Sequence, residues 1–164
     1  MDPHKGLDDI IDMITNDIKN STLIFIIGTG KVTQNNLHKI RKKAGEVNVK
    51  VILKYEISEI EKFKIIKESS VMIFPSYFEG FGIPPLEAIY CQTPVVVFDL
   101  PVLQEYGGAN LLYVPIGDYR KMGVLAGQIL NNNTFFINKI KSRKGYIDNI
   151  AKMKNKDKLL RIFK

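Results

Sequence analysis

The sequence predicts an α/β fold in which a parallel β-sheet lies between two layers of helices. Short apolar runs, such as Leu23–Ile27 and Pro94–Phe98, are rich in β-branched residues and read as strands. They alternate with longer segments in which apolar residues recur at helical spacing. Continuous apolar runs are typical of strands that helices bury on both faces. The alternation therefore predicts repeated strand–helix–strand units with parallel strands.

Five strands and seven helices are expected along the chain. The strands cover residues 23–27, 49–53, 71–74, 94–98 and 111–114. The helices cover residues 7–19, 34–44, 59–68, 84–90, 119–131, 135–142 and 145–162. Pro84 and Pro85 suit the first turn of a helix, where a missing N–H costs little. Because ligands bind at the carboxyl ends of the strands in such sheets, the loops after the strands are the places to search for a site.

The length and composition indicate one globular domain over residues 1–164, which includes the C-terminal helices. No run of about 20 apolar residues is present to span a membrane, and the N-terminus lacks a signal-peptide core. The single cysteine, Cys91, excludes a disulfide within the chain and reads as a small buried hydrophobe. We therefore expect a cytoplasmic protein.

The net charge of +7 suits an anionic partner such as a diphosphate, a lipid surface or nucleic acid. A compositional bias towards lysine explains the charge equally well. Nucleic acid is disfavoured, because the basic residues lack an aromatic platform motif. Peripheral association with the inner face of a membrane stays open. The basic residues of the C-terminal region read as a solvated helix face; they are Lys139, Lys141, Arg143, Lys144, Lys152, Lys154, Lys156 and Lys158.

The segment from Pro75 to Pro94 carries the most chemical information, because it follows a predicted buried strand and opens a helix. Gly80 and Gly82 leave the backbone free to approach a ligand closely. The helix that follows presents free N–H groups and the positive end of its dipole. This arrangement suits an oxygen-rich ligand such as a hexose or a phosphate.

Two carboxylates, Glu79 and Glu87, bracket this turn. A carboxylate accepts hydrogen bonds from two adjacent hydroxyls, so the pair is able to hold the two ends of one ligand. The alternative is that Glu87 caps the helix or faces solvent. The spacing of two glutamates does not decide between these interpretations.

The ten residues from Glu79 to Ala88, EGFGIPPLEA, resemble the E-x7-E signature of glycosyltransferase family 4. Further similar stretches are Asp2–Asp8 (DPHKGLD), Ile27–Gly30 (IGTG), Cys91–Val96 (CQTPVV), Asp99–Glu105 (DLPVLQE) and Leu112–Asp118. The resemblance spans roughly residues 2–120. It implies a Rossmann-like, three-layer α/β/α domain, the C-terminal half of a retaining enzyme of the GT-B fold.

The resemblance also implies roles for individual residues. Glu79 contacts the donor sugar near its anomeric centre and is the catalytic candidate. Glu87 binds the ribose hydroxyls, and Lys5 binds the donor diphosphate. The remaining donor-binding candidates are Gly28 and Gly30, the backbone of Gly80, Phe81, Gly82 and Ile83, and the Lys54–Ile57 loop with Tyr55 beside the base.

Several of these assignments have alternatives. Gly28 and Gly30 also suit a tight turn without a phosphate, since the third glycine of a dinucleotide fingerprint is missing. Lys54 stands where many family members have glycine, which leaves the base open. Ser76 and Tyr77 read as loop residues, and Asp99 and Glu105 as turn or cap residues. Tyr55, Tyr77 and Phe81 are able to stack on a base or sugar, but core or surface packing is the preferred interpretation.

The expected function is donor binding in a hexosyltransferase, with a mannose-like sugar carried by a nucleotide diphosphate. The family's acceptor-binding N-terminal domain would precede Met1, so sugar transfer is expected to need that domain or a partner subunit. No cofactor is expected. No metal is expected either, since an Asp-x-Asp motif is missing and the few His and Cys residues are scattered. The alternatives are a non-catalytic nucleotide or nucleotide-sugar binding module and, with less support, a dinucleotide-binding oxidoreductase domain.

Overall fold

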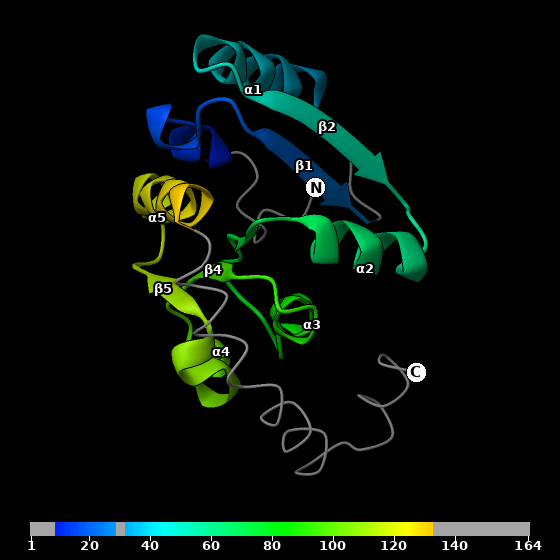
Figure 1. The fold of residues 1–164 in the computed structure, drawn as a ribbon, viewed down its shortest axis with the longest axis vertical. Helices are drawn as coiled ribbons and strands as arrows, with labels where there is room; N and C mark the ends of the chain where they lie inside the picture. The colour runs from blue at the N-terminus through cyan, green and yellow to red at the C-terminus, as the bar shows by residue number, and fades with distance from the viewer. Residues whose placement is uncertain (1–8, 29–31, 133–164) are drawn as a thin grey trace.

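The computed structural model describes residues 9–28 and 32–132, and these form an α/β fold with parallel strands (Figure 1). The predicted fold class is confirmed. Five strands lie in two sheets: β1 (Thr22–Ile27) pairs with β2 (Lys50–Tyr55), and the second sheet has the order β3 (Met72–Phe74), β4 (Val95–Phe98) and β5 (Leu112–Val114). The expectation of one sheet is therefore corrected to two. Lys5, Gly30 and the helices expected over 135–142 and 145–162 lie outside the described residues.

Helices alternate with the strands along the chain and pack beside them. Figure 1 shows α1 and α2 on opposite sides of the β1–β2 pair, and α5 beside the blue segment near the start of the described chain. The helices are α1 (Gln34–Glu46), α2 (Glu59–Glu68), α3 (Ile83–Tyr90), α4 (Pro101–Gly107) and α5 (Tyr119–Asn131), with the 3-10 turns η2 (Ile10–Met13), η3 (Asn16–Ile18) and η4 (Gly108–Asn110).

Side-chain caps fix where three helices begin. The side-chain oxygens of Thr33, Ser58 and Asp118 accept hydrogen bonds from the backbone N–H three residues later, at 3.2, 3.2 and 3.0 Å. Each bond satisfies a donor that the first helical turn leaves without a partner. These caps lie before α1, α2 and α5, whose predicted positions are confirmed.

The helix predicted over residues 7–19 is wrong for the part that the structure describes. Ile14 and Thr15 adopt extended backbone angles between η2 and η3. The Thr15 hydroxyl accepts from the N–H of Asp17 at 3.3 Å, and this local bond competes with a continuous helix. Ile10, Ile14 and Ile18 are nonetheless buried, as their periodicity indicated.

Two glycines of α5 explain how closely this segment packs. A Cβ atom at Gly123 would collide with the backbone oxygen of Met13, and one at Gly127 with that of Asp17. The glycines let the backbone of α5 touch η2 and η3 directly. Tertiary contact therefore holds this irregular segment in place of the expected helix.

Burial differs between the two sheets. All four residues of β4 are fully buried, as predicted. In β1, Phe25 and Ile27 are buried, whereas Ile24 and Ile26 are 36% and 40% exposed, so the expectation of a strand buried on both faces is wrong there. Cys91, expected in the core, is half-buried at the end of α3.

Candidate functional site

The glycine turn that precedes α3 is the centre of the candidate site. Gly82 is the residue before the helix and has φ = 76°, a left-handed conformation that favours glycine. Ile83, Pro84 and Pro85 then open the helix, as the prolines predicted. Just after β3, the buried hydroxyl of Ser76 donates to the carbonyl oxygen of Phe78 at 3.0 Å. The turn is thus built by local backbone constraints on both sides.

Side chains of α4 pack against the turn and form a hydrogen bond to its backbone. The hydroxyl of Tyr106 donates to the carbonyl oxygen of Gly82 at 2.7 Å, and its ring lies 5.4 Å from that of Phe81. A Cβ atom at Gly82 would lie 2.6 Å from a methyl group of Leu103 and 2.8 Å from the Tyr106 hydroxyl. Glycine is required at Gly82 for space as well as for backbone angle. The sequence reading missed α4, in which Glu105 is a helical residue rather than a turn residue.

Glu87 lies inside the protein near the middle of α3, with only 3% of its side chain exposed. Its Oε1 atom accepts a hydrogen bond from Lys62 Nζ at 2.8 Å. Its Oε2 atom is buried and has no hydrogen-bond partner among the described residues. The alternative in which Glu87 caps the helix or faces solvent is therefore wrong.

Glu79 is half-buried and lies close to the same turn. Its Cβ atom is 3.9 Å from the position that a Cβ of Gly82 would take. Burial raises the pKa of Tyr106, and the charges of Tyr113 and Glu79 raise it further. The structure thus brings together Glu79 and the backbone of Gly80, Phe81, Gly82 and Ile83, with Glu87 further along α3.

The other described candidates lie at the carboxyl ends of β1 and β2. Gly28 follows β1 and is exposed. Lys54 and Tyr55, expected in a loop, are instead the last two residues of β2. Lys54 donates to Glu61 of α2 at 2.9 Å, and Tyr55 is 46% exposed. Helix α2 therefore contacts both the end of β2 and Glu87.

Tyr77 packs against the core, as the preferred interpretation of the sequence predicted. Its hydroxyl donates to the carboxylate of Asp9 at 3.1 Å, and its ring lies 5.3 Å from Phe98 and 6.3 Å from Tyr119. Burial and the interaction with Tyr77 raise the pKa of Tyr119. The sequence carries no local signal for these contacts, because they join distant segments.

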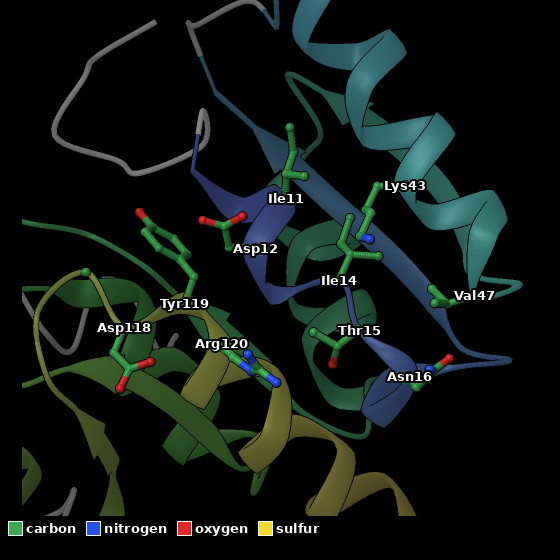
Figure 2. Close-up of a pocket in the computed structure, with 11 residues that line it drawn as sticks. Ile11, Asp12, Ile14, Thr15, Asn16, Lys43, Val47, Asp118, Tyr119 and Arg120 are labelled. Atoms are coloured by element: carbon green, nitrogen blue, oxygen red, sulfur yellow. The ribbon is translucent and has the colours of Figure 1, made fainter.

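A cavity of about 550 Å³ lies elsewhere, between η2–η3, the end of α1 and the start of α5 (Figure 2). Ile11, Ile14 and Val47 give it apolar walls. Charges of both signs also line it, from Lys43, Arg120, Asp12 and Asp118. No candidate from the glycine turn lines it, so we do not assign the site there.

The described ranges contain neither a metal-binding cluster nor a membrane-spanning helix. In residues 9–28 and 32–132, no group of three or more His, Cys, Asp or Glu side chains is placed to hold a metal ion. Every helix in that same part of the chain is too short or too polar to cross a lipid bilayer.

The glycine turn between Glu79 and Glu87 follows β3, a half-buried parallel strand, and opens α3 within an α/β fold. The chain belongs to the family described as "Glycosyl transferases group 1", whose model matches residues 1–153.

Curated relatives cover part of the chain. The chain is 41% identical over 69 residues to the O-antigen chain mannosyltransferase RfbU of Salmonella typhimurium, which is 42% of this chain and 20% of that protein. It is 29% identical over 90 residues to the serotype-specific mannosyltransferase WbdA of Escherichia coli, 55% of this chain and 11% of that protein. The matched segments thus span a fifth or less of these relatives.

Solved structures share the fold. Anabaena HepE in complex with UDP and glucose has a TM-score of 0.72 and 16% identity, over 88% of this chain and 40% of that one. A mutant of S. aureus TarM in complex with UDP and other ligands has a TM-score of 0.72 and 21% identity, over 99% of this chain and 33% of that one. At these identities the likeness concerns the GT-B fold alone.

Proposed function

We propose that this chain is the donor-binding domain of a retaining glycosyltransferase of family 4, which moves a hexose from a nucleotide diphosphate sugar to an acceptor. The observation that carries the proposal is Glu87: a buried carboxylate on α3 with one oxygen bound to Lys62 and the other without a partner. Buried polar atoms normally have partners, so an unpartnered acceptor beside a glycine turn is a marker of a ligand site.

In this proposal Glu87 accepts from the ribose hydroxyls, and Glu79 orients the sugar near its anomeric carbon. The N–H groups of the turn between them bind sugar hydroxyls and phosphate oxygens, aided by the dipole of α3. Lys5 and the loop of Gly28 and Gly30 bind the diphosphate. The end of β2, with Lys54 and Tyr55, flanks the base.

A mannose-like donor sugar is the preferred substrate, because the relatives RfbU and WbdA are described as mannosyltransferases. The reaction is proposed to need no metal, with the leaving diphosphate stabilised by Lys5 and the turn. An acceptor-binding N-terminal domain or subunit is proposed to close over the donor and exclude water. Peripheral contact with a membrane through basic residues stays part of the proposal.

A thermal-shift screen with UDP, GDP, ADP and their hexose conjugates tests the proposal first. A ligand that binds only the folded state stabilises it, by about 2.7 kcal/mol at a concentration 100 times the Kd. We expect one base to give a concentration-dependent rise in Tm. The absence of a rise with all three bases would contradict the proposed function.

Two alanine variants then test the site by calorimetric titration. Glu87→Ala is expected to weaken binding of the nucleoside diphosphate, because the ribose loses its acceptor. Glu79→Ala is expected to weaken mainly the sugar-bearing ligand. Equal affinity of the wild type and Glu87→Ala for the nucleotide would remove the ribose assignment.

A further inference from the structure

Lys62 connects the surface of α2 with the interior carboxylate of α3. Its Nζ atom lies 2.7 Å from Oε2 of Glu59 and 2.8 Å from Oε1 of Glu87. The side chain of Glu59 is 73% exposed, whereas that of Glu87 is 3% exposed. Lys62 itself is 22% exposed, so its ammonium group bridges a solvated and a buried carboxylate.

The Lys62–Glu87 pair joins two helices, and it is more buried than the pairs Lys43–Glu46 and Lys54–Glu61. Lys43 and Glu46 are 43% and 51% exposed, and Lys54 and Glu61 are both 42% exposed. Pairs of that kind contribute little, because water screens them. A buried ion pair is screened much less, and the loss of one partner leaves the other without compensation. Lys62 is such a partner for Glu87, at 2.8 Å from Oε1.

Lys62 contacts one of the two carboxylate oxygens of Glu87. Lys62 engages Oε1, while Oε2 is buried without a partner among residues 9–28 and 32–132. Leaving a buried acceptor without a partner is unfavourable, and a hydroxyl donor from a ligand would offset that cost. Glu59, at the exposed end of α2, also accepts from Lys62 Nζ at 2.7 Å, so the lysine has an acceptor on each side.

We propose that Lys62 is a positioning residue for the nucleotide ribose: it holds the Glu87 carboxylate by Oε1, so that Oε2 is presented to a ribose hydroxyl. The inference rests on the proposed function, and it adds a residue of α2 that lies outside the glycine-turn segment and the other stretches resembling the family. Lys62 acts through Glu87 and does not itself contact the nucleotide. The specificity for ribose over a sugar without hydroxyls thereby depends on a lysine 25 residues earlier in the chain.

The test compares UDP with 2′,3′-dideoxy-UDP by calorimetry, or GDP with its dideoxy form if the screen selects guanine. The wild type is expected to prefer the ribonucleotide by about tenfold or more, since a hydrogen bond to a charged group is at stake. Lys62→Met is expected to lose most of that preference while its affinity for the dideoxy ligand stays the same. Lys62→Arg keeps the charge and is expected to retain part of the preference.

Lys43→Met is the matched control, because it breaks an i,i+3 lysine–glutamate pair far from α3 along the chain. It should bind both ligands like the wild type. If Lys62→Met weakens both ligands equally, the lysine only supports packing and the inference is overturned. If the variant binds both ligands like the wild type, the inference also fails.

A double variant covers the case in which Lys62→Met leaves an unpaired buried charge and does not fold. Lys62→Met combined with Glu87→Gln replaces the ion pair with neutral side chains. It should bind UDP as Glu87→Gln alone does, because Lys62 acts only through the carboxylate. A further loss in the double variant would overturn the inference. A wild type that binds none of the nucleotides would instead overturn the proposed function, and this inference with it.

Discussion

Tyr106 in α4 donates its hydroxyl hydrogen to the carbonyl oxygen of Gly82 across 2.7 Å, and both groups are buried. The bond joins the end of the glycine turn to a helix that follows the next strand. The left-handed backbone of Gly82 aims its carbonyl at this hydroxyl, so the angle and the bond support one another.

Tyr106→Phe is expected to lower the free energy of unfolding by about 1–3 kcal/mol, because the buried carbonyl of Gly82 is left without its donor. The ring contact with Phe81 remains, so the fold should persist. Chemical denaturation followed by circular dichroism measures the change. Tyr113→Phe is a useful comparison, since its hydroxyl bonds the carbonyl of Leu103 in a less buried position and should cost less. Equal losses would mean that burial of the turn is unimportant.

Alkaline pH is expected to destabilise the protein through the same tyrosine. Burial raises the pKa of Tyr106 above its usual value of 10.0, and Tyr113 and Glu79 add to the shift. The unfolded chain releases this proton near pH 10 while the folded chain keeps it, so stability is full below pH 10 and falls as the pH rises above it. Urea midpoints measured between pH 8 and pH 11 should fall less for Tyr106→Phe than for the wild type. A parallel fall in both proteins would contradict the expectation.

The extent to which the sequence predicts this fold depends on whether a contact is local. Helix α2 lies where the pattern predicted it, because Ser58 caps its start and the periodicity continues to Glu68. The glycines and prolines before α3 likewise predicted the turn and the start of the helix. Segment 7–19 was not, because the packing of Gly123 and Gly127 against its backbone comes from a distant helix.

The same limit applies to the candidate site. The sequence located Glu79 and Glu87, since their spacing around the turn is a local pattern. It gave no sign that Lys62 reaches Glu87, because that contact joins two helices and no spacing rule relates their residues. The bond from Tyr106 to Gly82 was missed for the same reason. Residues that support a site from another element thus require the structure.

Gly127→Ala is expected to destabilise the protein by about 1–3 kcal/mol, because the new methyl group would collide with the backbone of Asp17. Gly45→Ala in α1 is the matched control, since a Cβ there meets nothing within 4 Å. That control should stabilise the protein by about 0.4–1 kcal/mol, as alanine restricts the unfolded chain and favours helix. Thermal unfolding of the two variants should therefore shift in opposite directions. A rise in Tm for Gly127→Ala would show that α5 does not pack closely on η3.

The ring of Tyr77 is expected to contribute more to the stability of the fold than its hydroxyl does. Tyr77→Phe removes the exposed bond to Asp9 and the hydrogen bond between the Tyr77 and Tyr119 side chains, and should cost about 1–2 kcal/mol. Tyr77→Ala also removes the ring from its contacts with Phe98 and Tyr119, and should cost about 3 kcal/mol or more. Equilibrium denaturation of both variants separates the two contributions. If Tyr77→Phe were as unstable as Tyr77→Ala, the hydrogen bonds of the Tyr77 hydroxyl to Asp9 and Tyr119 would supply the stability, and the ring contacts would be secondary.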